Sequence, residues 1–300
     1  MAAKALSRSK GFVQQLFADF SADDCTSMAA ALAYYTIFSL PSLLLIIIYI
    51  AGLVFGQDAA SGEIQSKLGT QMGPQAAAEI QVMVSNAAHH HGAGLIATVL
   101  GLAGLIFSAI GVVMQLQMCI NRAWKVSSAG MGIRSYIMKR INSGLLLVGV
   151  GILAIVSLAA GSVLSAFSRS VPWAPAATLA ENLGSLLVFS LLFAVILKVL
   201  PDAEIRWRDV WLGAAVISIL FILGKFFIGL YLAHGGTSGT YGAAGSLALI
   251  LLWTYYSALV VLLGVEFTQV WVRQQGREIE PRAGAVRVGS RTEIAATSIR

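Results

Sequence analysis

Six long runs of apolar residues dominate the hydrophobic pattern of this chain. They cover approximately residues 29–55, 93–119, 143–167, 183–200, 210–232 and 243–271. A helix of about 20 residues crosses a hydrocarbon core about 30 Å thick, so each run is long enough to span a membrane. Because lipid offers the backbone no hydrogen-bond partners, a spanning run must be helical. The pattern therefore predicts an all-α polytopic membrane protein with six transmembrane helices.

Two shorter amphipathic patterns lie outside these runs. The first has apolar residues at helical spacing before residue 29, namely Phe12, Val13, Leu16, Phe17 and Phe20. It predicts a short helix that either lies in the membrane interface or packs beneath the bundle. The second is weaker and basic, covers residues 130–142, and predicts an interfacial helix along an anionic lipid surface.

The longest connection, residues 56–92, has helical patterns of its own. Pro74 suits the first turn of a helix. The segment after it has one apolar face, made by Ala76, Ala77, Ile80, Met83, Val84 and Ala87. Ile64, Leu68 and Met72 form a shorter apolar stripe before it. Since an unstructured loop of this length is unusual in a compact bundle, we expect a helical hairpin across the outer end.

These patterns divide the chain into one domain with two tails. Residues 1–28 form an amphipathic N-terminal segment, residues 29–272 form the six-helix bundle, and residues 273–300 form a basic tail. The tail lacks apolar periodicity, and we therefore expect it to be largely disordered.

Composition agrees with a chain that lies mostly in lipid. Hydrophobic residues make up 57% and charged residues 11% of the sequence, whereas soluble domains carry about 25% charged residues. The net charge of +6 alone would suggest nucleic-acid binding. The basic residues, however, lie at the predicted membrane edges rather than in one stripe. Membrane lipids are therefore the expected partners, and nucleic acid is not.

Ionisable residues inside the runs are the first candidates for function, because they are costly there. Lys198 ends the fourth run and Glu266 lies near the end of the sixth, so the helical rise places both near the same face. Their matching depth and opposite charge predict a structural ion pair. Lys225 lies in the outer half of the fifth run. There it either extends its amine to the lipid headgroups or contacts an anionic substrate.

Other chemical signals are weaker. Cys25 and Cys119 match no disulfide or metal framework, so reduced thiols are expected. The three histidines at 89–91 suit a solvated cluster better than a metal site, because consecutive helical residues do not converge on one ion. The glycine-rich segment 235–245 suits either a mobile gate or a close-packed turn. No catalytic triad, carboxylate pair or metal-ligand spacing stands on a water-facing segment. We therefore expect neither an enzyme nor a bound cofactor or metal.

Three motifs stand out along the chain. The first is Ala31-Leu32-Ala33-Tyr34-Tyr35-Thr36-Ile37-Phe38-Ser39-Leu40-Pro41. The second is Leu200-Pro201 followed by Trp207-Arg208-Asp209 and Gly213. The third is Tyr241-Gly242-Ala243-Ala244-Gly245, followed by Leu251-Leu252-Trp253-Thr254-Tyr255 and Leu263-Gly264-Val265-Glu266. Together the three motifs resemble the YihY/virulence factor BrkB family, once mislabelled ribonuclease BN. Lys225 and Tyr231 also lie where the family tends to keep them. The resemblance covers about residues 10–272. It implies a six-helix bacterial inner-membrane protein, with transport of lipids or other amphiphiles a recurring suggestion.

The resulting hypothesis is a transporter or flippase of an anionic or amphiphilic, lipid-like substrate that works without ATP hydrolysis. Pro41 should kink the first helix and open polar backbone groups. The candidate substrate-binding residues are Lys225, Tyr34, Tyr35, Pro41, Tyr231 and Tyr241. The alternative is a non-transporting scaffold or assembly partner for envelope proteins, and a membrane-embedded enzyme is a third possibility.

The distribution of lysine and arginine predicts the orientation. Sixteen of the 20 fall in the N-terminal segment, the second and fourth connections and the C-terminal tail, and only Lys67 and Arg169 fall in connections on the other side. Since basic residues concentrate in cytoplasmic loops, both termini should be cytoplasmic. Reporter fusions after residues 28, 130, 205 and 280 should give cytoplasmic signals, and fusions after 75 and 175 external ones. An external signal at 130 or 280 would contradict this topology.

Overall fold

The computed structural model describes residues 2–56, 61–62, 64–66, 68–69, 74–89, 95–127, 149, 174–233, 242–282 and 284–288. Its long helices are α1 (Ala2–Ala22), α2 (Cys25–Phe55), α4 (Pro74–His89), α5 (Leu95–Ala123), α7 (Ala174–Val199), α8 (Trp207–Ala233) and α9 (Gly242–Gln274). Four two-residue strands accompany them: β1 (Val126–Ser127), β2 (Ala203–Glu204), β3 (Glu280–Pro281) and β4 (Val286–Arg287).

Helices coincide with five of the six apolar runs, so the mostly helical character of the chain is confirmed. These helices are α2, α5, α7, α8 and α9. Run 143–167 lies outside the described residues apart from Gly149, and segment 130–142 lies outside them entirely. By length and composition, three described segments are able to cross a membrane: Cys25–Tyr49, Trp207–Phe227 and Leu247–Gln274. The count of six spans stays a prediction.

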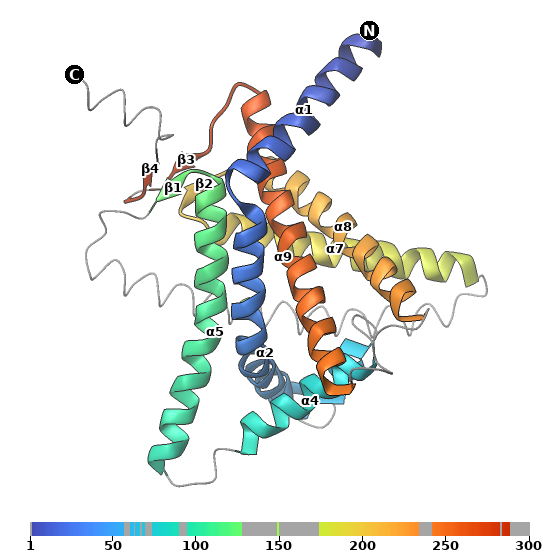
Figure 1. Ribbon diagram of the computed structural model, residues 1–300, viewed down its shortest axis with the longest axis vertical. Helices are drawn as coiled ribbons and strands as arrows, with labels where there is room; N and C mark the ends of the chain where they lie inside the picture. The colour runs from blue at the N-terminus through green and yellow to red at the C-terminus, as the bar shows by residue number, and fades with distance from the viewer. Residues whose placement is uncertain are drawn as a thin grey trace.

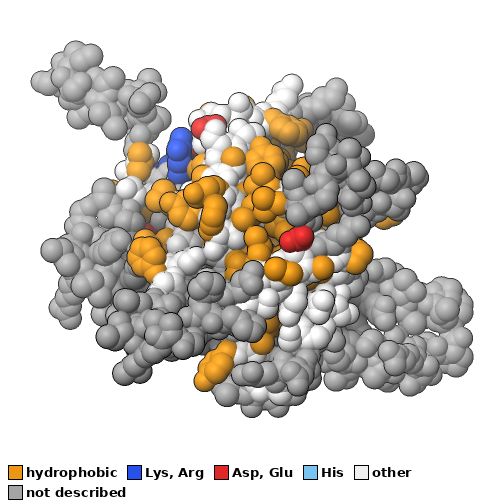
Figure 2. Space-filling model, turned by 60° about the horizontal axis from the view of Figure 1, so that its bottom comes forward, with side chains coloured by type: hydrophobic (Ala, Val, Ile, Leu, Met, Phe, Trp, Pro, Cys, Tyr) orange, Lys and Arg blue, Asp and Glu red, His pale blue; other side chains and the backbone are white. Residues whose placement is uncertain are grey.

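Helix α9 lies between α2 and α8 and packs against both (Figure 1). Helix α5 packs on the far side of α2, and α7 packs on α8. Figure 2 shows hydrophobic side chains over much of the described surface on one face. Exposed phenylalanines in the described helices include Phe38, Phe107, Phe226 and Phe227. Large exposed apolar patches are unfavourable in water, and they suit helices whose outer faces contact lipid.

Helix α1 extends away from the bundle beyond its contact with α9 (Figure 1). Leu16 is buried, and the Phe12 ring lies 5.1 Å from the Phe267 ring, centroid to centroid, in an edge-on arrangement. Val13 and Phe17 are exposed. One apolar edge of the predicted amphipathic helix therefore packs on α9, while the other faces outward.

Helix α4, in the connection between the first two runs, packs across one end of the bundle (Figure 1). The helix begins at Pro74, as expected, and buries Ala76, Ala77, Ile80 and Val84. Ala76, Ile80 and Val84 form one hydrophobic cluster with Ile64 before them and with side chains of α2 and α9, among them Leu44, Ile250 and Trp253. The apolar face predicted for this connection is thus the face that closes the end of the bundle.

Pro41 lies inside α2, as the sequence predicts. Because proline has no amide hydrogen, the carbonyl of Ile37 loses its helical donor. Figure 1 shows the lower part of α2 turned away from the direction of its first turns. The bend agrees with the proline in the middle of the helix.

Glycines permit the close approach of α8 and α9. A Cβ built on Gly264 of α9 would lie 2.1 Å from Cγ1 of Ile217 on α8 and 3.3 Å from the carbonyl oxygen of Gly213. In return, a Cβ on Gly213 would lie 2.0 Å from Oγ1 of Thr268 on α9. Ile217 and Thr268 are fully buried. Small residues at such crossings let the helix backbones pack directly, as in membrane helix pairs.

The prediction of a disordered tail after residue 272 is wrong for the part that the structure describes. Strand β3 pairs antiparallel with β2, and β4 pairs antiparallel with β1. The backbone N–H of Arg282 also donates to the carbonyl of Asp202 at 2.8 Å. Two-residue strands leave no periodicity in a sequence, and here the order comes from backbone hydrogen bonds to the connections after α5 and α7. Residues 289–300 lie outside the described residues.

Replacing Gly264 with alanine should destabilise the protein by about 1–3 kcal/mol, since the added methyl group overlaps a buried isoleucine. The matched control is Gly104→Ala in α5, where nothing lies within 4 Å of the added Cβ. There the better helix propensity of alanine should leave stability unchanged or slightly raised. Thermal unfolding in detergent measures both variants. Equal transition temperatures for Gly264→Ala and the wild type would show that the crossing is loose.

Candidate functional site

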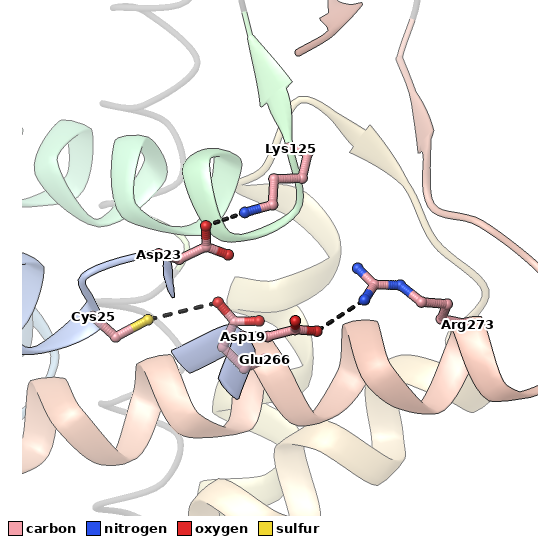
Figure 3. Close-up of polar contacts among 6 residues, drawn as sticks. All are labelled: Asp19, Asp23, Cys25, Lys125, Glu266 and Arg273. Atoms are coloured by element: carbon pink, nitrogen blue, oxygen red, sulfur yellow. Dashed lines mark hydrogen bonds and ion pairs between the residues drawn. The ribbon is translucent and has the colours of Figure 1, made fainter. Parts of the chain in front are cut away.

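Ionisable side chains from four helices and their turns converge at one end of the bundle (Figure 3). We call this set the polar cluster. It consists of Asp19, Asp23, Cys25, Lys125, Glu266 and Arg273. The cluster lies where α1 joins α2, where α5 ends, and in the last three turns of α9. Parts of the N-terminal segment, the second connection and the C-terminal segment are thereby brought together.

Two left-handed residues direct the backbone toward this cluster. Asp24 has φ 56° and separates α1 from α2, and Lys125 has φ 55° and follows the end of α5. Aspartate tolerates this conformation better than most residues, while lysine adopts it less often. The tight α1–α2 turn places the Asp23 carboxylate next to the ammonium group of Lys125, and the two form an ion pair. Local backbone geometry therefore creates a contact between residues 102 positions apart.

A second ion pair lies at the rim of the cluster. The Arg273 guanidinium donates to Oδ2 of Asp19 at 2.9 Å, which joins the end of α9 to α1. Both side chains are partly exposed, so the pair contributes only about 0–1 kcal/mol. Its main consequence is positional, because it holds α1 over the end of α9.

Glu266 is the deepest charged residue of the cluster, with 0% of its surface exposed. Its Oε1 accepts a weak hydrogen bond from the Cys25 thiol at 3.6 Å. Its Oε2 is buried and has no hydrogen-bond partner within the described part of the chain. Figure 3 shows Glu266 between the carboxylates of Asp23 and Asp19, each of which points to its own cation. Glu266 therefore has two acidic neighbours and no cationic partner among the described residues.

The predicted ion pair between Lys198 and Glu266 is wrong. The Lys198 ammonium donates to the carbonyl of Ile205 and lies 5.8 Å from the centre of the Trp207 ring. It therefore caps the connection from α7 to α8, while Glu266 faces α1 and α2. Matching depth brought the two residues to the same level, but the direction of each side chain around its helix separates them.

A second set of polar contacts holds the C-terminal segment beside the polar cluster. Arg277 donates to both carboxylate oxygens of Asp209, at 2.7 and 2.8 Å, and this raises the pKa of the guanidinium. The Asn121 amide donates to Asp202 at 2.7 Å and its oxygen accepts from the Asp202 N–H at 2.9 Å. These contacts join the ends of α5, α7, α8 and α9. Bidentate pairs of this kind fix orientation as well as adding energy.

A polar cleft of about 700 Å³ lies between the α7–α8 connection and the C-terminal segment. Its walls carry four basic and four acidic side chains: Lys198, Arg206, Arg277 and Arg282, and Glu204, Asp209, Glu278 and Glu280. The charges balance, and Arg277 is already held by Asp209. The lining therefore favours neither an anion nor a cation.

An aromatic stripe runs along the exposed side of α2. It consists of Tyr34, Tyr35 and Phe38, which are 60%, 45% and 64% exposed. The Tyr34 ring lies 6.0 Å from the Tyr35 ring and 4.7 Å from the Phe38 ring, centroid to centroid. Neither tyrosine hydroxyl has a hydrogen-bond partner within the described residues.

Two further predicted site residues, Lys225 and Pro41, do not join this stripe. Lys225 lies on α8 and is partly buried, and α9 separates α8 from α2 (Figure 1). Pro41 lies partly buried one turn beyond the stripe. Tyr241, the side chain of Tyr231 and the side chains of the three histidines lie outside what the structure describes, as do residues 234–240. Cys25 and Cys119 are both free and buried.

Sequence reasoning missed most of the polar cluster. Asp23 and Lys125 carry no recognisable spacing, because their contact depends on two left-handed turns. A usable signal was the pair of acidic residues directly before an apolar run, at Asp23 and Asp24. Asp209 was noted only as part of a motif, although an acid in the first turn of a membrane helix calls for a basic partner elsewhere.

The apolar helices with a polar end define a membrane protein, and sequence comparisons place it in a family. The sequence profile described as Virulence factor BrkB matches residues 16–287. The chain therefore belongs to this family.

Curated relatives of the chain are membrane proteins from bacteria. A UPF0761 membrane protein of Tolumonas auensis is 31% identical over 180 residues, which cover 57% of this chain and 56% of the relative. One from Azotobacter vinelandii is 28% identical over 264 residues, or 85% of this chain and 62% of the relative. The chain thus spans less than two thirds of the length of these relatives. No solved structure matches it.

Replacing Asp209 with asparagine should release the C-terminal segment, because Arg277 loses its bidentate partner. A released segment is open to protease, so trypsin should cleave after Arg277 and Arg282 several times faster than in the wild-type protein. The control is Glu278→Gln, which breaks only the exposed pair with Arg287 and should change cleavage little. If Asp209→Asn is cleaved at the wild-type rate, the strand pairing alone is enough to hold the segment.

Proposed function

We propose that this membrane protein moves an anionic or amphiphilic, lipid-like substrate across the membrane without ATP hydrolysis. The observation that supports the proposal is the aromatic stripe on α2. Its rings offer apolar faces and its tyrosines offer hydroxyl groups, a combination that suits a molecule with both an apolar body and a polar head. We further propose that the role is not enzymatic and that membrane lipids are the partners.

The depth of the stripe in the span supports this function. Tyr34 and Tyr35 follow Cys25, the first residue of α2, by nine and ten residues, which is about 14–15 Å along a helix. That is about half of a hydrocarbon core about 30 Å thick. A hydroxyl group exposed to lipid tails at that depth has no partner and is unfavourable. A polar head passing along α2 would supply the missing hydrogen bonds.

The backbone of α2 adds polar groups at the same level. The Thr36 hydroxyl donates to the Leu32 carbonyl at 2.7 Å, and Ser108 of α5 donates to the Phe38 carbonyl at 3.2 Å. Pro41 leaves the carbonyl of Ile37 without its helical donor. Carbonyl oxygens that are under-satisfied in this way would accept hydrogen bonds from a substrate head or from accompanying water. They extend the proposed path by about one turn from the stripe toward Pro41.

Lys225 has a separate part in the proposal. It lies 18 residues after Trp207, the first residue of α8, or about 27 Å along the helix. This is close to the opposite end of the membrane from the polar cluster. We assign it a contact with an anionic headgroup at that surface, and extension of the amine to ordinary lipid headgroups is the alternative.

The proposed location is the bacterial inner membrane, with both termini and the polar cluster on the cytoplasmic side. The excess of basic residues in the segments that meet at this end supports the orientation. Within the described structure, Lys125, Arg273, Arg277 and Arg287 all lie in these segments. The acyl chains and headgroups of this membrane would then also be the nearest supply of substrate.

Removing the two hydroxyl groups tests the proposal directly. In sealed proteoliposomes containing a fluorescent phospholipid analogue, the purified protein should speed the loss of fluorescence to an external quencher. The double variant Tyr34→Phe, Tyr35→Phe should slow this flux by roughly fivefold to 150-fold, since each of the two lost hydrogen bonds contributes about 0.5–1.5 kcal/mol. Both substitutions keep the aromatic ring, so the double variant should fold like the wild-type protein.

Tyr49→Phe is the matched control, because Tyr49 is equally exposed on α2 but lies beyond Pro41. It should retain wild-type flux. Lys225→Met, measured in the same assay, should reduce flux if the lysine contacts the substrate head and should not if its amine only reaches ordinary headgroups. If the wild-type protein gives a flux no faster than empty liposomes, the transport proposal is wrong and the scaffold alternative is favoured.

A further inference from the structure

Buried oxygen atoms outnumber hydrogen-bond donors around Glu266. Oδ2 of Asp23, Oε2 of Glu266 and Oε1 of Gln269 are all buried and lack partners within the described residues. The nearby donors are already used, because the Lys125 ammonium bonds the other oxygen of Asp23 and the Cys25 thiol bonds the other oxygen of Glu266. Trp271 Nε1 is also buried and has no partner within the described residues, so it donates to none of these oxygen atoms.

Charge is unbalanced at the same place. Among the described residues, the ionisable groups that interact with Glu266 are Asp19 and Asp23, from α1 and its turn, and Cys25 from α2. Cys119 of α5 lies next to Cys25. Lys125 pairs with Asp23 and Arg273 pairs with Asp19. Ionised Glu266 would therefore be a fully buried negative charge next to two further carboxylates. A buried charge without a partner is strongly unfavourable.

A single proton removes the charge imbalance and reduces the shortage of donors. It cancels the charge of Glu266 and turns one of its oxygens into a donor for a neighbouring acceptor. A divalent metal ion fits less well, because Mg²⁺ and Ca²⁺ take about six or more oxygen ligands. Within the described residues no three His, Cys, Asp or Glu side chains are arranged to hold a metal ion.

We propose that Glu266 is a proton-binding site that is protonated while α1, α2 and α9 are packed together and that releases its proton to water when they separate. The step breaks the O–H bond of the carboxyl group, and the proton passes to a water molecule, which leaves the carboxylate on Glu266. Repacking of the helices reverses it. The site stands on the packing alone. Its use as the coupling site of transport rests on the proposed function, with a proton as the coupling ion.

The expected sign of the pH dependence follows from proton counting. The packed protein holds a proton on Glu266 that the unfolded chain loses above the ordinary value for glutamate, about 4.3. The stabilisation that protonated Glu266 contributes to the folded protein is therefore fully present below that pH. It is lost as the pH rises and Glu266 of the packed protein ionises. The unfolding constant should increase by up to about tenfold per pH unit in that window.

The test compares the wild-type protein with Glu266→Gln between about pH 5 and pH 9. Glutamine resembles the protonated acid in shape and charge, so this variant should lose the part of the pH dependence that belongs to Glu266. Infrared difference spectra of the wild type against the variant should show the carbonyl band of a protonated carboxyl group at neutral pH. Glu278→Gln is the matched control, since it removes an exposed acid outside the polar cluster and should leave both results unchanged.

Several outcomes would overturn the proposal. Parallel pH profiles of the wild type and Glu266→Gln, with no protonated carboxyl band, would show that Glu266 is ionised. If the stability of the wild-type protein depends on Na⁺ or Li⁺ at constant pH, the site binds a metal cation instead of a proton. If Glu266→Gln does not fold, titration of the carboxyl band in the wild-type protein and in Asp23→Asn still shows whether Glu266 is protonated. A protonated Glu266 in a protein without flux would sink only the transport proposal.

Discussion

Helix α9 packs against α1, α2, α4, α5 and α8, so its sequence has to suit five neighbours at once. Each face meets this demand differently. Gly264 lets α8 approach closely, Leu262 joins the hydrophobic cluster at the start of α2, and Trp253 packs against α4. Glu266 faces α1 and the first residue of α2. The positions of the other helices depend on this one, because in lipid the close fit of helix surfaces replaces the hydrophobic effect as the main source of specificity.

The polar end of the bundle is ordered by backbone hydrogen bonds as well as by ion pairs. The C-terminal segment pairs through β3 and β4 with the connections after α7 and α5, so one segment holds two loops that are far apart in sequence. The bidentate Asp209–Arg277 pair fixes the start of the C-terminal segment to α8. A network whose members are held in this way loses little entropy when it meets a ligand or a proton, since its geometry already exists. Order at this end therefore complements the tight packing within the bundle.

Much of the fold could be predicted from the sequence because lipid makes a strong demand on length and polarity. The apolar runs predicted the ends of five helices to within about four residues, except that α7 begins at Ala174, well before its run, and the apolar face after Pro74 predicted α4. The candidate site was harder. Helix rise fixed the depth of Lys198 and Glu266 but not their direction around the helix axes, so the inferred pair was wrong. The Asp23–Lys125 contact depends on the left-handed turn at Asp24, and the paired tail depends on main-chain atoms that every residue shares.

The geometry of α2 and α9 connects the two proposals. Gly264 and Glu266 are two residues apart, or about 200° around α9, so the face that holds α8 lies opposite the face that holds the α1–α2 turn. A movement of α2 away from α9 would therefore expose Glu266 while the α8–α9 crossing stayed intact. Helix α2 carries Cys25 at its first turn, and the two tyrosines of the aromatic stripe follow less than three turns later, on the same side of Pro41. Because a helix is rigid over that length, loss of the proposed proton at Glu266 would shift Tyr34 and Tyr35 together, and the bend at Pro41 would absorb the displacement.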